Sequence, residues 1–222
     1  MKKNLLLFAS ALAVLCACTK EIATSETVEQ TKEDTIEIPE GYILYELGAE
    51  LSKVAIDDKS LSWEAGDSIK LVTDKGQYIS KPIAEGGKSA SFVFAIPEED
   101  TPLFGVYPAK TTSKIVNDSL VVSIPTDVVA KFSNVNLMCG KINGNTISFR
   151  NAAHLVKFTT SNKNLSRIQF CELEGKNIKG DIAVAFDGDN IVVRPLEENA
   201  KRSFSCNLEG AGTYYLAIFP SN

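Results

Sequence analysis

The stretch DIAVAFDGDNIVVR, residues 181–194, decides the fold class. Two runs rich in apolar and β-branched residues flank the turn sequence Asp187-Gly188-Asp189-Asn190. Asp, Gly and Asn suit the backbone conformations of tight hairpin turns, and β-branched side chains favour extended backbone. The stretch therefore predicts an antiparallel hairpin with strands at 181–186 and 191–194.

Similar short extended runs follow one another along the chain on both sides of this hairpin. Gly, Pro and Asn separate them, and no window longer than ten residues after Glu40 has a convincing helical period. Short strands at regular spacing predict an all-β chain with a β-sandwich architecture. The expected strands are 42–45, 68–72, 77–79, 90–94, 103–107, 119–124, 146–149, 154–160, 167–173, 203–208 and 213–219, together with the hairpin.

Two aromatic segments that end in proline, 104–108 and 216–220, resemble each other. This similarity is compatible with two β domains in tandem, which we place at residues 41–145 and 146–222. After the strand at 213–219, a sandwich would ordinarily pair a further strand. We therefore expect either a truncated second domain or a sheet left open to a strand of a partner.

The N-terminal residues follow the order of a secretory signal. A basic start precedes an apolar run from Leu5 to Leu15, which is shorter than the ~20 residues of a membrane span. The run ends in Leu15-Cys16-Ala17-Cys18, which resembles a lipobox, where the cysteine thiol forms a diacylglycerol thioether before cleavage. We expect a lipoprotein signal peptide at 1–17 and lipidation at Cys18, with several acyl chains giving a stable anchor.

Residues 18–40 contain seven acidic residues and two lysines. Such a segment buries too little apolar surface to fold, so we predict a flexible acidic tether. The whole chain has a net charge of −5 and a pI near 5.1, which argues against nucleic acid or an anionic membrane surface as partner. We expect membrane contact through the lipid anchor only.

The remaining cysteines and the histidine favour no catalytic or metal site. Cys139, Cys171 and Cys206 are odd in number and lack CxxC spacing, so we interpret them as small buried hydrophobic residues; one pair could still oxidise outside the cytoplasm. His154, the only histidine, lies in an expected strand. No G-x-S-x-G elbow, P-loop or G-x-G-x-x-G occurs. We predict no enzyme activity, no cofactor and no metal.

The acidic residues and the single tryptophan have structural interpretations. Carboxylate groups at 57–58, 98–100 and 187/189 fit solvated loops and turns. Trp63-Glu64-Ala65-Gly66-Asp67 is the most distinctive local motif. Trp63 either stacks on a sugar or packs in the core ahead of a turn in which Asp67 accepts backbone N–H bonds, and we favour the second interpretation.

Several segments, taken in order, are similar to the fimbrillin-like (Mfa-like) lipoproteins of anaerobic bacteria. The Trp-x-x-Gly-Asp motif is the most specific of them, and the resemblance spans nearly all of the mature chain. The segments are the lipobox at Cys18, the acidic tether, and residues 53–56, 61–69, 90–92, 106–108, 137–140, 147–151, 165–173 and 178–180.

The resemblance implies two transthyretin-like β-sandwich domains in tandem, and a structural or adhesive subunit of fimbriae at the outer-membrane surface. In that family an outer protease removes the lipidated leader and an N-terminal strand. A neighbouring pilus subunit then donates a strand to the vacated groove, and backbone hydrogen bonds and alternate side chains hold it there. The implied partners are therefore other pilus subunits, joined by β-strand exchange.

One feature of the chain departs from that pattern. The family's processing protease favours arginine, but the first arginine here is Arg150, and the tether offers only Lys20 and Lys32. A retained lipid suits an anchor or accessory subunit better than a shaft subunit. The alternative function is a glycan-binding surface lipoprotein of a nutrient-uptake system, which predicts an exposed aromatic platform with Trp63 and Tyr78.

Overall fold

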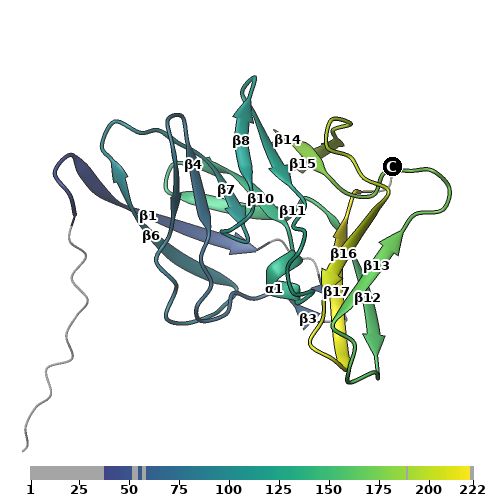
Figure 1. Ribbon diagram of the computed structural model, residues 1–222. Helices are drawn as coiled ribbons and strands as arrows, with labels where there is room; N and C mark the ends of the chain where they lie inside the picture. The colour runs from purple at the N-terminus through teal and green to yellow at the C-terminus, as the bar shows by residue number, and fades with distance from the viewer. Residues whose placement is uncertain (1–37, 52–54, 57–58, 189, 221–222) are drawn as a thin grey trace, which may run out of the picture. The chain divides into compact units, whose positions relative to one another are not determined.

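The computed structural model describes residues 38–51, 55–56, 59–188 and 190–220, and strands make up nearly all of their regular structure (Figure 1). Strand β14 (Asp181–Asp187) pairs antiparallel with β15 (Asn190–Pro195), and Val184 lies opposite Val193. The predicted hairpin is therefore confirmed, and so is the all-β class. Within those ranges the only helix is α1 (Phe132–Val135).

Seven strands form the largest sheet, in the order β5, β4, β7, β10, β11, β1 and β6. Just beyond β5, the backbone N–H of Lys81 donates to the Val93 carbonyl of β6 at 2.9 Å, so the sheet nearly closes on itself. Alternate side chains point inward and share one apolar core. The strands are β1 (Tyr42–Leu51), β4 (Lys70–Thr73), β5 (Gln77–Ile79), β6 (Ser89–Pro97), β7 (Pro102–Tyr107), β10 (Met138–Asn143) and β11 (Thr146–Asn151).

The other strands form smaller sheets. A four-stranded sheet has the order β15, β14, β9 and β8, and three two-stranded ribbons pair β12 with β17, β13 with β16, and β2 with β3. The strands are β2 (Ala55–Ile56), β3 (Lys59–Ser60), β8 (Ser113–Val116), β9 (Ser119–Ser123), β12 (His154–Thr160), β13 (Arg167–Cys171), β16 (Ser203–Asn207) and β17 (Gly212–Ile218).

The β12–β17 and β13–β16 ribbons pack against each other over a core of their own (Figure 1). The ring centroids of Phe158 on β12 and Phe170 on β13 are 5.4 Å apart, and those of Phe170 and Phe204 on β16 are 5.8 Å apart. Aromatic contacts of this kind add to the burial of apolar area. Each ribbon therefore relies on the other to bury its apolar face.

Strands from both sides of residue 145 share sheets. The turn Asn143–Thr146 joins β10 to β11, and β11 also pairs with β1, the first strand of the described chain. Likewise β9 pairs with β14 across the same point. The domain boundary expected between 145 and 146 therefore does not coincide with a break between sheets, because the pattern that predicts a strand does not identify its partner.

Two glycines allow the core of the largest sheet to close. Gly105 of β7 lies opposite Gly140 of β10. A Cβ atom at Gly105 would come within 2.5 Å of the Ile147 side chain and 2.9 Å of the Phe149 ring, and one at Gly140 would come within 2.6 Å of Ile147. The two bare backbone positions leave the space that these two β11 side chains fill.

The predictions for the N-terminus fall largely outside the described residues. The signal peptide at 1–17, Cys18 and the tether as far as residue 37 all lie there. In the part of the chain that the structure describes, we find no helix with the length and apolar character needed to span a membrane.

Candidate functional site

Strand β1, YILYELGAEL, is the first strand of the described chain, yet it lies between two other strands of the largest sheet. It runs antiparallel to β6, with Tyr42 opposite Pro97 and Glu50 opposite Ser89. On its other side it runs parallel to β11, but only from Gly48 to Leu51. Within the described residues, the chain joins β1 to the other strands of the sheet at its C-terminal end only.

The side chains of β1 alternate between the core and the surface. Leu47 and Ala49 are fully buried, whereas Glu46 and Glu50 are exposed on the opposite face. The Ser91 hydroxyl of β6 donates to the Glu46 carboxylate at 2.6 Å. From Glu46 to Leu51 this two-residue period gives β1 one apolar face and one polar face, so this half of the strand specifies which face packs on the core.

Trp63 lies inside the largest sheet, next to β1. Its side chain is 2% exposed, and its indole N–H donates to the Ala49 carbonyl at 3.4 Å. The indole contacts three aromatic rings edge-on. Their centroid distances are 5.0 Å to Phe92, 5.5 Å to Tyr107 and 5.5 Å to Phe149. The prediction of a core tryptophan is confirmed, and the sugar-stacking interpretation of Trp63 is wrong because no sugar reaches a buried face.

The Asp67 carboxylate accepts the hydrogen bonds that hold the Trp63–Asp67 motif in place. One carboxylate oxygen accepts the Glu64 backbone N–H at 2.8 Å, as the sequence predicted, and the other accepts the Tyr107 hydroxyl at 2.9 Å. Burial and the neighbouring Asp67 carboxylate raise the pKa of Tyr107 far above its usual range, so the phenol keeps its proton and donates. Gly66, at φ 93°, supplies a turn conformation that a side chain would strain.

The N-terminal half of β1 has an open side. Toward the N-terminus of β1, the final contacts on the β11 side are with the turn between β10 and β11. The Gly48 N–H donates to the Asn145 carbonyl at 2.9 Å, and the Tyr45 hydroxyl donates to the Gly144 carbonyl at 2.9 Å. Beyond them no described strand pairs with β1 on this side. The exposed apolar residues there are Tyr42 at 39%, Ile43 at 39% and Leu44 at 46%. An edge of this kind is prone to pair with another strand.

Tyr78, the second aromatic expected in a glycan platform, is tied into a turn. It is half-buried, and its hydroxyl donates to the Asp100 carboxylate at 2.7 Å. Burial and the hydrogen bond to Asp100 raise the pKa of Tyr78 to about 12. Asp100 also accepts the Thr73 hydroxyl at 2.8 Å. Together with the burial of Trp63, this arrangement counts against a platform built from the two residues.

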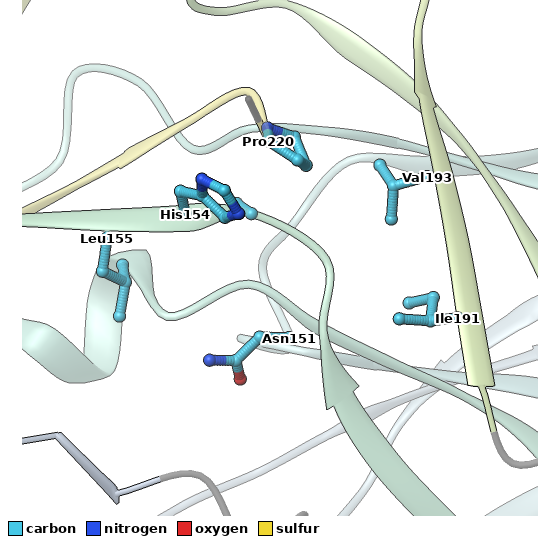
Figure 2. Close-up of a pocket in the computed structure, with 7 residues that line it drawn as sticks. Asn151, His154, Leu155, Ile191, Val193 and Pro220 are labelled. Atoms are coloured by element: carbon cyan, nitrogen blue, oxygen red, sulfur yellow. The ribbon is translucent and has the colours of Figure 1, made fainter. Parts of the chain in front are cut away.

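His154 borders an open cavity of about 610 Å³. Figure 2 shows it at the start of β12, opposite Ile191 and Val193 of β15 and close to Pro220. The other walls come from Asn151, Ala153 and Leu155, so most of the lining is apolar. His154 is the only titratable group among these lining residues, and an acid–base pair needs two.

The predicted cysteine and carboxylate positions are spread over the fold. Cys139 and Cys206 are buried, as expected, but Cys171 is exposed, and all three are free thiols. Cys171 lies on the outer face of β13, because its neighbours Phe170 and Ile168 take the inner positions. Across the described ranges, no group of three His, Cys, Asp or Glu side chains is placed to hold a metal ion. Residues 57, 58 and 189 lie outside those ranges.

The sequence pattern missed the position of β1 as a site. Residues 42–45 were expected as a strand, but alternation alone does not reveal that this strand continues to Leu51 between two partners. The apolar residues at 47, 49 and 51, every second position, were the available signal.

Comparisons of the chain with known proteins give no match, whether with family models, curated proteins or solved structures.

Proposed function

We propose that this chain is a surface-exposed lipoprotein, anchored through Cys18, that acts as a fimbrillin-like structural or adhesive subunit of fimbriae. Its site is the place that β1 occupies. Neighbouring subunits join when a strand from one chain takes the place of the first strand in another.

The observation that carries the proposal is the placement of β1. The strand comes first in the described chain, pairs with β6 along nearly its whole length, and pairs with β11 at its C-terminal end. One cut after β1 would therefore free it without breaking any connection between the other described strands. Its departure would leave two unpaired ladders and an apolar groove floored by Trp63, Phe92 and Phe149.

Backbone and side chains divide the recognition between them. The ladders of β6 and β11 supply hydrogen bonds to a strand of any sequence. Leu47 and Ala49 are the fully buried side chains that a replacing strand has to reproduce, and a buried leucine contributes about 2 kcal/mol relative to an exposed one. The open side of Tyr42–Leu44 adds an apolar surface where an incoming strand makes its first contact.

The test uses a single new cleavage site. Lys53 follows β1 in the sequence, and no arginine precedes Arg150, so K53R creates an arginine site that separates β1 from the body. The full-length mature variant is cut with an arginine-specific protease and mixed with a fluorescent peptide of residues 41–52. We expect one peptide to bind per cut chain and none per uncut chain. A cut protein that takes up no peptide contradicts strand exchange.

The anchor is tested separately. Labelled palmitate fed to a host that processes lipoproteins should enter the wild-type chain and not Cys18→Ala. Equal labelling of both proteins contradicts lipidation at this residue.

A further inference from the structure

We infer that Trp63 sets the register of the strand in the β1 position, by admitting only alanine or glycine where Ala49 now lies. This inference rests on the proposed function and adds the kind of strand that the site accepts.

The indole lies over a pair of small residues. Ala49 is opposite Ala90 of β6, and the Trp63 indole N–H donates to the Ala49 carbonyl at 3.4 Å. On one side of this pair the indole contacts Phe92, and on the other side it contacts Phe149.

The strand registers place these two rings one step to either side of Ala49. Phe92 lies opposite Leu47, two residues before Ala49, and Phe149 lies opposite Leu51, two residues after it. The indole therefore spans the level of Ala49, and the absence of larger side chains at 49 and 90 leaves the room that it fills.

The backbone of Trp63 is fixed in place. Its N–H donates to the Gly87 carbonyl at 2.7 Å, and the Gly87 N–H donates back to the Trp63 carbonyl at 3.0 Å. At Gly86 a Cβ atom would come within 2.2 Å of the Trp63 carbonyl oxygen, so the two segments are already as close as they can be. The indole also contacts Phe92, Tyr107 and Phe149 edge-on, so although a cavity of about 150 Å³ lies beside it, moving aside for a larger residue at 49 would disturb these packed rings.

The position of the Trp63 indole distinguishes strand registers that the alternation of side chains leaves equivalent. A register shift of one residue would place Glu46 or Glu50 in the core. The two-residue alternation of apolar and charged side chains is enough to exclude this shift. A slip of two residues keeps the apolar face inward but brings Leu47 or Leu51 to the level of Trp63. Only the small residue at position 49 distinguishes the correct register from these two-residue slips. The accepted strand therefore has large side chains at the positions of residues 45, 47 and 51, and a small one at the position of residue 49.

Peptide exchange into the cut K53R protein tests the inference. Three fluorescent peptides of residues 41–52 are compared: the parent sequence, Ala49→Leu, and Glu50→Leu as the matched control, which adds the same side chain on the exposed face. We expect the parent and Glu50→Leu peptides to bind within threefold of each other and Ala49→Leu to bind at least tenfold more weakly. In a Trp63→Phe body, which has a smaller ring, the Ala49→Leu peptide should regain at least threefold.

The outcomes separate the two proposals. Binding of Ala49→Leu within threefold of the parent overturns the inference while strand exchange stands. Failure of the parent peptide to bind overturns strand exchange and the inference together. If the Trp63→Phe body does not fold, as judged by circular dichroism, the contrast between Ala49→Leu and Glu50→Leu decides alone. Trp63 is the single tryptophan of the chain, so its emission provides a second reading of occupancy.

Discussion

Lys179 offers the sharpest prediction for stability, because it is a buried cation. Its side chain is 3% exposed, and its ammonium lies 3.9 Å from the centroid of the Phe204 ring. The backbone is fixed on both sides, since the Lys179 N–H donates to the Lys201 carbonyl at 3.2 Å and the Lys201 N–H donates to the Lys179 carbonyl at 2.7 Å. Replacement by methionine keeps the length of the side chain and removes the charge.

The magnitude follows from the pKa of Lys179, which burial lowers from 10.5 to about 8. A displacement of that size corresponds to about 3 kcal/mol of folding free energy lost to the buried charge. A pKa reports the net balance of burial and attraction, so the nearby Phe204 ring does not reduce this figure further. We therefore expect Lys179→Met to be more stable than the wild type by about 1–3 kcal/mol at pH 7.

The pH dependence has a definite sign. Below pH 8 the lysine is protonated in both the folded and the unfolded chain, so the full penalty is present. Between about 8 and 10.5 the folded chain gives up its proton first, so the stability of the wild type rises relative to the variant as the pH rises. Above 10.5 the penalty has gone. Groups that do not interact with Lys179 titrate alike in both proteins and cancel from the difference, whereas the Cys206 thiol, whose raised pKa Lys179 partly lowers, contributes to it.

Urea unfolding at pH 7 and pH 10 measures this difference, with Lys201→Met as the matched control because Lys201 is the exposed partner in the same backbone pair. We expect the control to change stability by less than about 0.5 kcal/mol at either pH. The reasoning is refuted if Lys179→Met is less stable than the wild type at pH 7, or if the advantage of Lys179→Met at pH 7 persists undiminished at pH 10.

Three further predictions concern packing, the motif and the thiols. Gly105→Ala should lower the free energy of unfolding by about 1–3 kcal/mol in urea titration, because its Cβ would meet Ile147 at 2.5 Å; an unchanged midpoint contradicts this. Tyr107→Phe should cost about 1–2 kcal/mol by the same measurement, since Asp67 loses a hydrogen bond of 2.9 Å, and a neutral result would mean that water replaces the hydroxyl without cost. A thiol reagent should modify Cys171 in the native mature protein and leave the two buried thiols of the described chain intact until urea is added; rapid native reaction at either one refutes the predicted burial.

The strands were predictable because their signal is local. The sequence of the hairpin at 181–194 contains both strands and the turn within one short stretch, so the pairing of β14 with β15 is local. The pairing of β1 with β6 and β11 is different, since it joins residues far apart in the sequence. No local pattern in 42–51 names those partners, which is why the expected boundary at 145 cut through the sheet that β1 completes.

The candidate site was predictable only in part, for a related reason. The Trp63–Asp67 motif stood out as a core tryptophan and a turn, and the structure adds that the indole lies on β1. On our inference that contact depends on the small residue at 49, and an alanine in an apolar strand carries no signal of its own. Cys171 shows the limit of residue type as a guide, because cysteines are mostly buried yet this one takes the outer face of β13.

The connection of β1 to its own chain decides what role the proposal allows. While β1 remains attached, its local concentration at the groove is on the order of millimolar, as for any segment on a short linker, so a free strand of equal affinity at micromolar concentration cannot displace it. Strand exchange into this site therefore requires cleavage after β1. A chain whose first arginine is Arg150, inside β11, gives an arginine-specific protease no site before that strand. On the proposed function, a chain that escapes cleavage keeps both its first strand and its lipid, which suits a subunit at the membrane end of an assembly, whereas a chain that is cut after β1, as the K53R variant allows, accepts a strand.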